Sequence, residues 1–380
     1  MHPAFAAAVF TFLGLAATAR AEGPSCWVYF GTSATDARRG IYVARLDQGT
    51  GALSSAVRAA DKSNSVFLAF APDRKHLYAL AEVARGTEAV ETYAVDAATG
   101  GLTSVGEQIP GGSEACHISV DPSGRCVLTA NYDAAYVEAF PVRGDATVGP
   151  RSSLIRFSGS GPNHSRQESA HPHSINVDPS GRFAVVCDLG QDKVFVYRLD
   201  AARGTLAPND PPFAPVAPGS GPRHFAFHPD GKYAFLISEL AASLTAFRWD
   251  GEQGVLTPVQ TVPILRPDYS GPTNTAAEVV VARSGKFVYG SNRGDDSLVV
   301  EAFDAATGRM TFVQRITDGV QVPRSYAIDP SGRWLVCANL TANTATVYRV
   351  DPDSGRLALT STISVPEPLC VRFLTAAPAN

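Results

Sequence analysis

The stretch "HSINVDPSGRFAVVCDLGQDKVFVYRLDAARGTL", residues 173–206, contains the pattern that decides the fold. A short alternating run leads into a D-P-S-G turn, two further apolar runs follow, and the stretch ends at D-A-A-R-G-T-L. In such a turn proline pre-sets the backbone, and glycine supplies the positive φ. The stretch therefore predicts short strands joined by tight turns.

Both markers of this stretch recur along the chain. Copies of the turn stand 47 to 57 residues apart, at Pro72-Asp73-Arg74-Lys75, Asp121-Pro122-Ser123-Gly124, Asp178-Pro179-Ser180-Gly181, His228-Pro229-Asp230-Gly231, Ala282-Arg283-Ser284-Gly285 and Asp329-Pro330-Ser331-Gly332. The second marker, D-x-x-x-G-x-[LM], ends an alternating strand at 47–53, 96–102, 200–206, 250–256, 304–310 and 351–357. A degraded copy at 142–150 fills the one gap, which gives seven units.

A period near 50 residues with four short strands per unit is typical of a β-propeller. We therefore predict an all-β, seven-bladed propeller with four antiparallel strands in each blade. The C-terminal "LCVRFL" (369–374) resembles a first strand, and the N-terminal "WVYFGTS", "IYVARL" and "ALSSAV" resemble strands two to four. One C-terminal and three N-terminal strands would complete the last blade and remove the open sheet edge.

Length and composition agree with one large β domain. The chain has 380 residues, with 33 Gly and 27 Pro but only 2 Met, and 45% of its residues are hydrophobic. These proportions favour many turns and a sizeable core. The net charge of −4 argues against broad electrostatic attraction to nucleic acid or an anionic membrane. We expect a monomer.

The first 21 residues differ from the rest of the chain. An apolar, alanine-rich run ends at Ala19-Arg20-Ala21, which matches a signal-peptidase site. The run is too short for a good membrane-spanning helix. We predict a secretory signal over 1–21, a single propeller domain over 22–380, export to the periplasm or beyond, and no membrane insertion after cleavage. A misassigned start or a membrane anchor is the alternative.

The six cysteines show no C-x-x-C pair, and most lie inside apolar strand patterns. We therefore expect buried thiols rather than disulfides, and no zinc site or cofactor.

Aligning the blades on the second turn residue brings polar residues to equivalent positions. Six residues before it stand Cys116, His173, Arg223 and Arg324; five before it, His117, His224 and Glu278; nine or ten after it, Asn131, Asp188, Glu239, Asn292, Arg293 and Asn339. The start of the first strand and the end of the second strand lie at the same end of a hairpin. We therefore expect these groups around one mouth of the central channel. Arginines there can bind a carboxylate or phosphate, and Glu or His can take a proton.

His171 and His173 are one residue apart, so two strand histidines at these positions would point the same way and suit a metal. However, His173 shares its blade position with Arg223 and Arg324, whose cations do not suit a metal site. We therefore predict no metal, and interpret the pair as one wall of an anion-binding, proton-handling pocket.

The chain resembles the lactonase family of seven-bladed propellers, which includes the propeller type of 6-phosphogluconolactonase and the fungal carboxy-muconate lactonizing enzyme. Matching segments include "GSGPNHSRQESAHPHSINVDPSGRFAVVCDLGQDKVFVYRLD" (159–200), "GSGPRHFAFHPDGKYAFLISEL" (219–240), "AAEVVVARSGKFVYGSNRGDDSLVVEAF" (276–303) and "VPRSYAIDPSGRWLVCANL" (322–340). The sequence departs from the family pattern at Ala81-Glu82, Ser325 and Ala338-Asn339-Leu340.

The resemblance implies a set of site residues. The catalytic candidates are His171, His173, Arg223, Glu239 and Arg293, and the substrate-binding candidates are Arg166, Gln167, His224, Glu278, Arg324 and Asn292. Arg166-Gln167 matches a family R-Q in a loop expected to close over the mouth. Glu239 or a histidine of the H-x-H would be the base, and Arg223 and Arg293 would hold the oxyanion and the substrate's anionic group.

Three functions remain open at this point. The first is a metal-independent lactone hydrolase of the 6-phosphogluconolactonase type that acts on an anionic lactone. The second is a cycloisomerase that forms a lactone from a muconate-like dicarboxylate. The third is a non-catalytic periplasmic binding propeller. A calcium-dependent lactonase is disfavoured because no Asp/Asn-rich loop set supplies the oxygen ligands.

Overall fold

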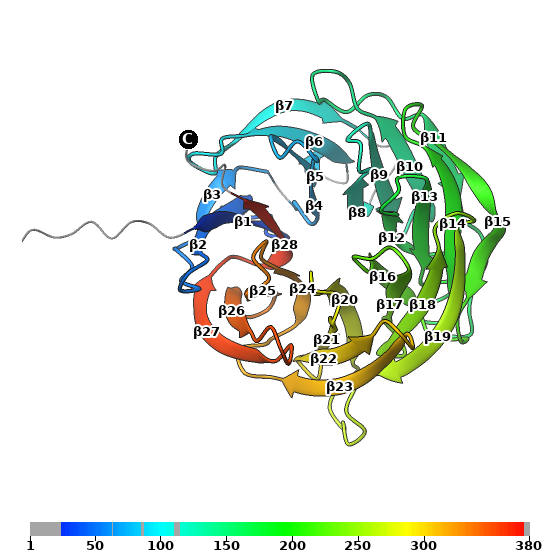
Figure 1. Ribbon diagram of the computed structural model, residues 1–380. Helices are drawn as coiled ribbons and strands as arrows, with labels where there is room; N and C mark the ends of the chain where they lie inside the picture. Colours follow the sequence, from blue (N-terminus) through cyan, green and yellow to red (C-terminus); the bar gives the residue numbers. More distant parts are fainter. Residues whose placement is uncertain (1–23, 63, 85–86, 110–114, 376–380) are drawn as a thin grey trace, which may run out of the picture.

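The structure is a computed structural model that describes residues 24–62, 64–84, 87–109 and 115–375. These residues form seven four-stranded antiparallel sheets arranged as a ring around a central channel (Figure 1). The described ranges contain no helix, and hence none long and apolar enough to cross a membrane. The predicted signal, 1–21, lies outside the described residues.

Within each blade, the strand nearest the channel comes first in the pairing order. The first four blades are β4 (Leu68–Phe70), β5 (His76–Ala84), β6 (Thr87–Val95), β7 (Leu102–Gln108); β8 (Ala115–Val120), β9 (Cys126–Asn131), β10 (Tyr136–Pro141), β11 (Ser153–Arg156); β12 (Pro172–Val177), β13 (Phe183–Asp188), β14 (Lys193–Asp200), β15 (Thr205–Pro215); β16 (Pro222–Phe227), β17 (Tyr233–Ser238), β18 (Ser243–Asp250), β19 (Val255–Pro263). The other three are β20 (Thr275–Val281), β21 (Phe287–Arg293), β22 (Ser297–Asp304), β23 (Arg309–Ile316); β24 (Pro323–Ile328), β25 (Trp334–Asn339), β26 (Thr344–Val350), β27 (Leu357–Ser364); β28 (Pro368–Thr375), β1 (Ser25–Thr32), β2 (Ile41–Asp47), β3 (Val57–Ala60).

The last blade closes the ring as the sequence predicts. The C-terminal strand β28 pairs antiparallel with β1, and β2 and β3 follow outward. In this register Gly31 lies opposite Cys370, whereas Cys26 lies opposite Thr375 at the other end of the pair. All six cysteines lie in the described part of the chain, and no disulfide joins them. Five of the six thiols are buried as predicted, and Cys116 is partly exposed.

The D-P-S-G turn is stabilised by its aspartate. The Asp178 carboxylate accepts hydrogen bonds from the backbone N–H groups of Ser180 (3.1 Å), Arg182 (2.9 Å) and Phe183 (2.9 Å), while Gly181 adopts a φ of 75°. The turns at Asp121 and Asp329 repeat this arrangement. The turn therefore fixes the first hairpin of a blade through local chemistry alone.

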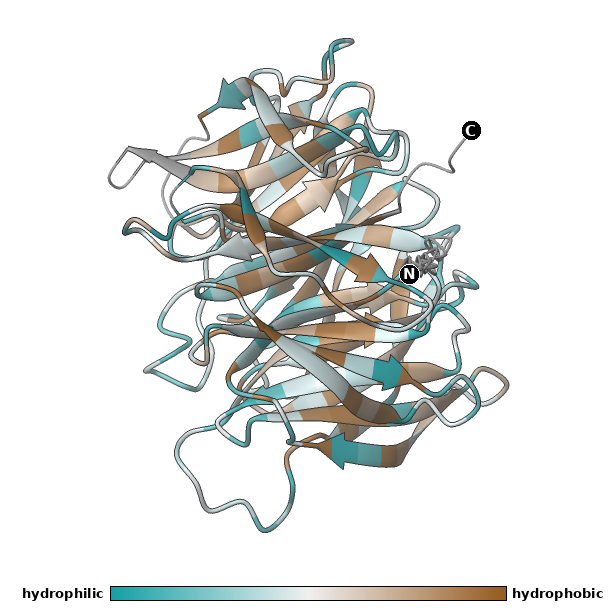
Figure 2. Cartoon of the chain, turned by 90° about the vertical axis from the view of Figure 1, so that its left-hand side faces the viewer, coloured by the Kyte–Doolittle hydropathy of each residue, from teal (hydrophilic) through white to brown (hydrophobic). Residues whose placement is uncertain are grey.

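The hydrophobic core lies between neighbouring blades. One cluster joins Val185 and Cys187 on β13 with Phe225 on β16 and Leu236 on β17, so the facing sheets of two blades share it. Apolar stretches follow the strands in Figure 2, and the connecting loops are mainly hydrophilic. Each blade therefore depends on its neighbours for burial of its faces.

In five of the seven blades, the glycine of the second marker packs against an aromatic ring of the preceding blade. Gly254 has a φ of 70°, and a Cβ added there would overlap the ring of Phe183 in the preceding blade. The same glycine–aromatic contact recurs at Gly51–Trp334, Gly100–Trp27, Gly308–Tyr233 and Gly355–Phe287. The marker is thus an inter-blade packing element as well as a turn.

We expect Gly254→Ala to destabilise the fold more than Gly231→Ala. The two glycines have nearly equal φ angles, 70° and 69°, but a Cβ on Gly231 would have no heavy atom within 4 Å. Both variants carry the cost of a left-handed alanine, about 1–2 kcal/mol. Only Gly254→Ala adds overpacking, about 1–3 kcal/mol, for a total of about 2–5 kcal/mol. Denaturant unfolding of both variants measures the difference, and equal losses would contradict the packing role.

Candidate active site

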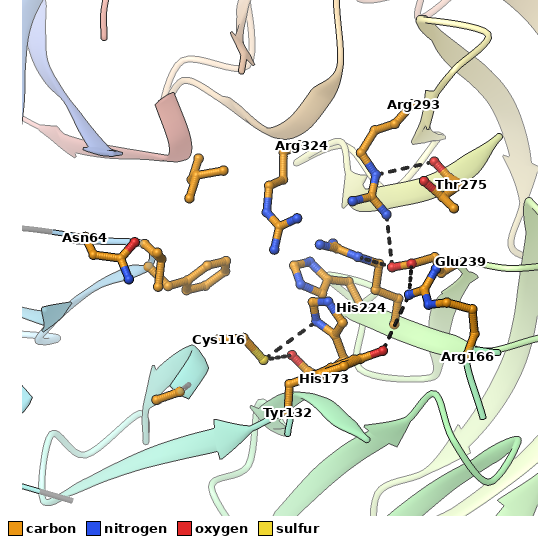
Figure 3. Close-up of a pocket in the computed structure, with 15 residues that line it drawn as sticks. Asn64, Cys116, Tyr132, Arg166, His173, His224, Glu239, Thr275, Arg293 and Arg324 are labelled. Atoms are coloured by element: carbon orange, nitrogen blue, oxygen red, sulfur yellow. Dashed lines mark hydrogen bonds and ion pairs between the residues drawn. The ribbon is translucent and has the colours of Figure 1, made fainter. Parts of the chain in front are cut away.

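A cavity of about 530 Å³ opens at the end of the channel where the inner strands begin. Its wall consists of Asn64, Val66, Phe67, Ala115, Cys116, Tyr132, Arg166, His173, Arg223, His224, Glu239, Thr275, Arg293, Arg324 and Leu369. Figure 3 shows Arg293 and Arg166 approaching Glu239 from different directions, with Arg324 projecting from another side of the same space. The predicted gathering of polar groups at one channel mouth is therefore present.

A β-bulge repeated in the inner strands places the first group of residues. In β16, Pro222 pairs with Ser238 and His224 pairs with Ile237, so Arg223 has no partner across the ladder. The same register shift leaves no residue directly opposite Cys116, His173 or Arg324 in the strand pairing of β8, β12 and β24. A bulge re-aims the side chain of its extra residue. All four of these residues line the cavity.

The second group lies at the end of the second strand in three blades: Tyr132 and Glu239 directly follow β9 and β17, and Arg293 is the last residue of β21. Tyr132, Glu239 and Arg293 each stand ten residues after the second turn residue and line the cavity. Arg293 pairs with Thr275, which also lines the cavity, whereas the preceding Asn292 pairs with Ala276 and does not line it. In these three blades, the residue ten positions after the second turn residue therefore lines the cavity.

Glu239 is held by three arginines. Its Oε1 lies 2.6 Å from Nη2 of Arg166, and its Oε2 lies 2.9 Å from both Nε of Arg223 and Nη2 of Arg293. Burial alone would raise the pKa of Glu239, but the cations of Arg293, Arg223 and Arg166 outweigh it and lower that pKa to about 2. Glu239 is therefore a permanent anion at neutral pH and a weak base.

Arg324 differs from the other three arginines. It makes no hydrogen bond or ion pair with any residue that the structure describes, and it lines the cavity. Burial and the nearby Arg223 lower its pKa to about 10, so it stays charged at neutral pH. Four arginines and one glutamate line the cavity, which leaves it strongly cationic. Such a site suits a ligand with a negative charge.

Two histidines contribute to the cavity wall. Nδ1 of His224 lies 2.8 Å from Oε1 of Glu278, and Nδ1 of His173 lies 3.9 Å from the sulfur of Cys116. Burial and the neighbouring Arg223 and His224 lower the pKa of His173 well below its usual value. Burial also lowers the pKa of His224, against the opposing effect of Glu278. Both imidazoles are therefore neutral at pH 7.

A smaller cavity of about 260 Å³ lies deeper in the channel. Phe67 and His224 line both cavities, whereas Glu278, His117 and Arg372 line only the smaller one. The ring centroids of His117 and His224 are 5.5 Å apart. The predicted substrate-binding residue Glu278 therefore lies behind the histidine rather than in the cavity that the arginines line.

Three further predicted residues do not line the cavity. His171 precedes β12 and stacks on Tyr132, with 4.3 Å between ring centroids. The Gln167 amide donates to the Leu189 carbonyl (2.8 Å), and the Asn292 amide donates to the Ile264 carbonyl (2.7 Å). These contacts satisfy buried loop groups. Gln167 and Asn292 thus bind loop carbonyls, and His171 stacks against Tyr132 outside the cavity lining.

Tyr132 is a cavity residue that the sequence interpretation missed. Its ring lies edge-on to His173, with centroids 5.4 Å apart, and its hydroxyl accepts from Nη2 of Arg166 at 3.4 Å. The signal was present, because Tyr132 occupies the repeat position of Glu239 and Arg293. In the described residues no group of three or more His, Cys, Asp or Glu side chains could hold a metal ion.

A seven-bladed propeller with an arginine-rich cavity at one channel mouth defines the class of protein. Residues 27–373 match the family described as "Lactonase, 7-bladed beta-propeller". The chain therefore belongs to the seven-bladed β-propeller lactonase family, as the sequence resemblance implies.

Several similar proteins span three quarters or more of the chain. A 6-phosphogluconolactonase of Bacillus subtilis (strain 168) is 36% identical over 91% of this chain and 97% of its own. A 6-phosphogluconolactonase of Formosa agariphila is 30% identical over 77% of this chain and 83% of its own. The solved structure of the periplasmic gluconolactonase of Pseudomonas aeruginosa superposes with a TM-score of 0.86, at 33% identity, over 93% of this chain and 100% of that one.

Proposed function

We propose that the protein hydrolyses an anionic sugar lactone, as an enzyme of the 6-phosphogluconolactonase type. The observation that carries the proposal is the Arg324 guanidinium, which has no hydrogen bond or ion pair with the described residues. It lines a cavity that contains four arginines and one glutamate. A planar guanidinium binds a phosphate or carboxylate through two parallel hydrogen bonds. The 6-phosphogluconolactonases of Bacillus subtilis and Formosa agariphila among its relatives support this substrate class.

The same cavity supplies what ester hydrolysis needs. Attack of water on the lactone carbonyl places a negative charge on the carbonyl oxygen, and fixed cations stabilise that charge. Glu239 holds Arg166, Arg223 and Arg293 in place through both of its oxygens. The arginines are therefore pre-positioned, while Arg324 stays available for the substrate's anionic group.

Export is a second part of the proposal. The A-R-A site after an apolar leader supports a secreted or periplasmic protein. The periplasmic gluconolactonase of Pseudomonas aeruginosa, a structural relative, supports the same compartment. Fractionation of the producing cells and the N-terminal sequence of the purified protein test it: export requires a mature chain that begins at or near Glu22.

Ring-opening rates test the proposed activity. The full protein is incubated with 6-phosphogluconolactone and with glucono-δ-lactone at pH 6.5, where spontaneous opening is slow enough to subtract. We expect enzymatic opening of the phosphorylated lactone, with formation of the open acid followed by mass spectrometry. Rates equal to the spontaneous ones for both lactones would refute hydrolysis. Lactone formation from a muconate-like dicarboxylate in the same panel would instead favour a cycloisomerase.

A further inference from the structure

The channel contains a histidine–carboxylate pair that is separate from the arginine cluster. Nδ1 of His224 lies 2.8 Å from Oε1 of Glu278, and both side chains are buried. His224 lies on β16 and Glu278 on β20, so the pair joins two adjacent blades. Only His224 reaches the arginine-lined cavity.

The carboxylate fixes the tautomer of the imidazole. Glu278 is an acceptor, so Nδ1 of His224 carries the hydrogen and Nε2 carries the lone pair. Nε2 makes no hydrogen bond with any residue in the described ranges. A second bond, from the backbone N–H of Val279 to Oε1 of Glu278 (3.1 Å), orients the carboxylate. In this arrangement a carboxylate holds an imidazole base in position.

The other candidate bases of the cavity are less suited. Both oxygens of Glu239 are bound by arginines, and its pKa is about 2. His173 contacts the sulfur of Cys116 through Nδ1, and it has no carboxylate partner in the described part of the chain. His171 lies behind Tyr132, outside the cavity wall. His224 is thus the one cavity-lining base, of the candidates above, that also has a positioning carboxylate.

We propose that His224 is the general base of the lactonase reaction and that Glu278 is its positioning residue. The proposal rests on the proposed function. Nε2 of His224 takes a proton from water, whose oxygen bonds to the lactone carbonyl carbon as the carbonyl electron pair moves to oxygen. When the carbonyl re-forms, the ring C–O bond breaks, and the ring oxygen takes the proton from the imidazolium. The resulting carboxylic acid releases its remaining proton to solvent, so one water is consumed.

The groups around His224 determine how it titrates. The titratable and charged groups around it are Glu278, Arg223, Arg324, His173 and His117, together with Arg372, which lines the smaller cavity with it. Burial and the two arginines favour the neutral imidazole, whereas Glu278 favours the imidazolium. Activity should therefore fall on acidification with an apparent pKa below the usual histidine value. Removing the negative charge of Glu278 should move this fall to still lower pH.

The test compares His224→Asn, Glu278→Gln and His173→Asn with the full-length wild type on one phosphorylated lactone between pH 4.5 and 7.5. Titration of the substrate phosphate is common to all four proteins and cancels in the comparison. We expect kcat to fall about 10²–10⁴-fold in His224→Asn, as for loss of a general base. In Glu278→Gln we expect a fall of about 10–100-fold together with a downward shift of the acidic limb.

Folding is monitored by near-UV circular dichroism. His224→Ala supplements the test, because free imidazole added to it should restore part of the rate. An unshifted acidic limb in a folded Glu278→Gln protein would overturn the role of Glu278. If His224→Asn keeps the full rate and the acidic limb of its pH–rate profile, and His173→Asn loses that limb, the base is His173. If the wild type itself opens no lactone, the proposed function fails instead, so the two failures are distinct.

Discussion

Arg324→Gln is expected to lower kcat/KM for 6-phosphogluconolactone by about 100-fold and to change the rate on glucono-δ-lactone by less than about threefold. Truncating one partner of a buried hydrogen-bonded charge pair costs about 2–5 kcal/mol, and 100-fold corresponds to about 2.7 kcal/mol. The selectivity arises because Arg324 makes no ion pair with the described residues and is available to the phosphate. Steady-state kinetics on the two lactones measure it.

Arg324→Lys is the matched control. Lysine keeps the positive charge but lacks the planar fork, so we expect a loss of about tenfold on the phosphorylated lactone. Equal losses on both lactones would mean that Arg324 acts on the reacting carbonyl or on the fold. Undiminished activity on the phosphorylated lactone would place the anion elsewhere in the cavity.

Stability gives an independent measure of the same variant. Arg223 lies close enough to Arg324 to contribute to its lowered pKa, so the cations repel one another without ligand. We therefore expect Arg324→Gln to unfold at the same temperature as the wild type or a higher one. A buried structural arginine would give the opposite result, because its loss leaves buried acceptors unpaired. A fall in the unfolding temperature would therefore indicate a structural role.

The blades could be predicted from sequence because their determinants are local. Asp178 and Gly181 close a turn through hydrogen bonds within five residues, and the same turn sequence recurs in several blades. Closure of the ring was also predictable, because the strands at both ends lack partners in their own unit. The inter-blade contact of Gly254 with Phe183 was not, since it joins residues of different repeats.

The candidate site was only partly predictable, for a geometric reason. In a regular strand His171 and His173 would point the same way, and the sequence interpretation placed both in one wall of the pocket. The bulge between Pro172 and Ser174 breaks that alternation, and only His173 lines the cavity. Bulges depend on backbone register, which the residue pattern does not specify. The repeat alignment nevertheless located Arg223 and Arg324, because it needs no assumption about side-chain direction.

The second strand shows the same limit at a single-residue scale. Residues nine and ten after the turn were treated as one class in the sequence interpretation, yet they have different environments. Asn292, at position nine, binds the Ile264 carbonyl, whereas Arg293, at position ten, lines the cavity. Applied to the blade that contains β9, the distinction selects Tyr132 rather than Asn131. The sequence alone therefore could not decide between positions nine and ten, and the observed strand ends were needed to identify the cavity residue.

Glu239→Gln is expected to destabilise the protein by about 3–5 kcal/mol in phosphate-free buffer, the usual result of breaking a buried ion pair by removing one partner. The glutamine keeps the shape of the side chain but leaves Arg166, Arg223 and Arg293 without their shared anion. Added inorganic phosphate should recover much of the loss by binding these arginines, with a larger shift in unfolding temperature than for the wild type. Calorimetry with and without phosphate measures both effects.

Glu301→Gln provides the control for this variant. Glu301 is also a buried carboxylate, on β22, but burial raises its pKa to about 7 against the effect of Arg315. It is therefore about half protonated at pH 7, and its replacement should cost less than that of the fully ionised Glu239. The pH dependence separates the two residues further. Because the folded-state pKa of Glu239 is lowered from 4.5 to about 2, its contribution is complete above about pH 4.5 and is lost as the pH falls toward 2. The stability gap between wild type and Glu239→Gln should narrow over that interval, and a gap independent of pH would contradict the charge-based explanation.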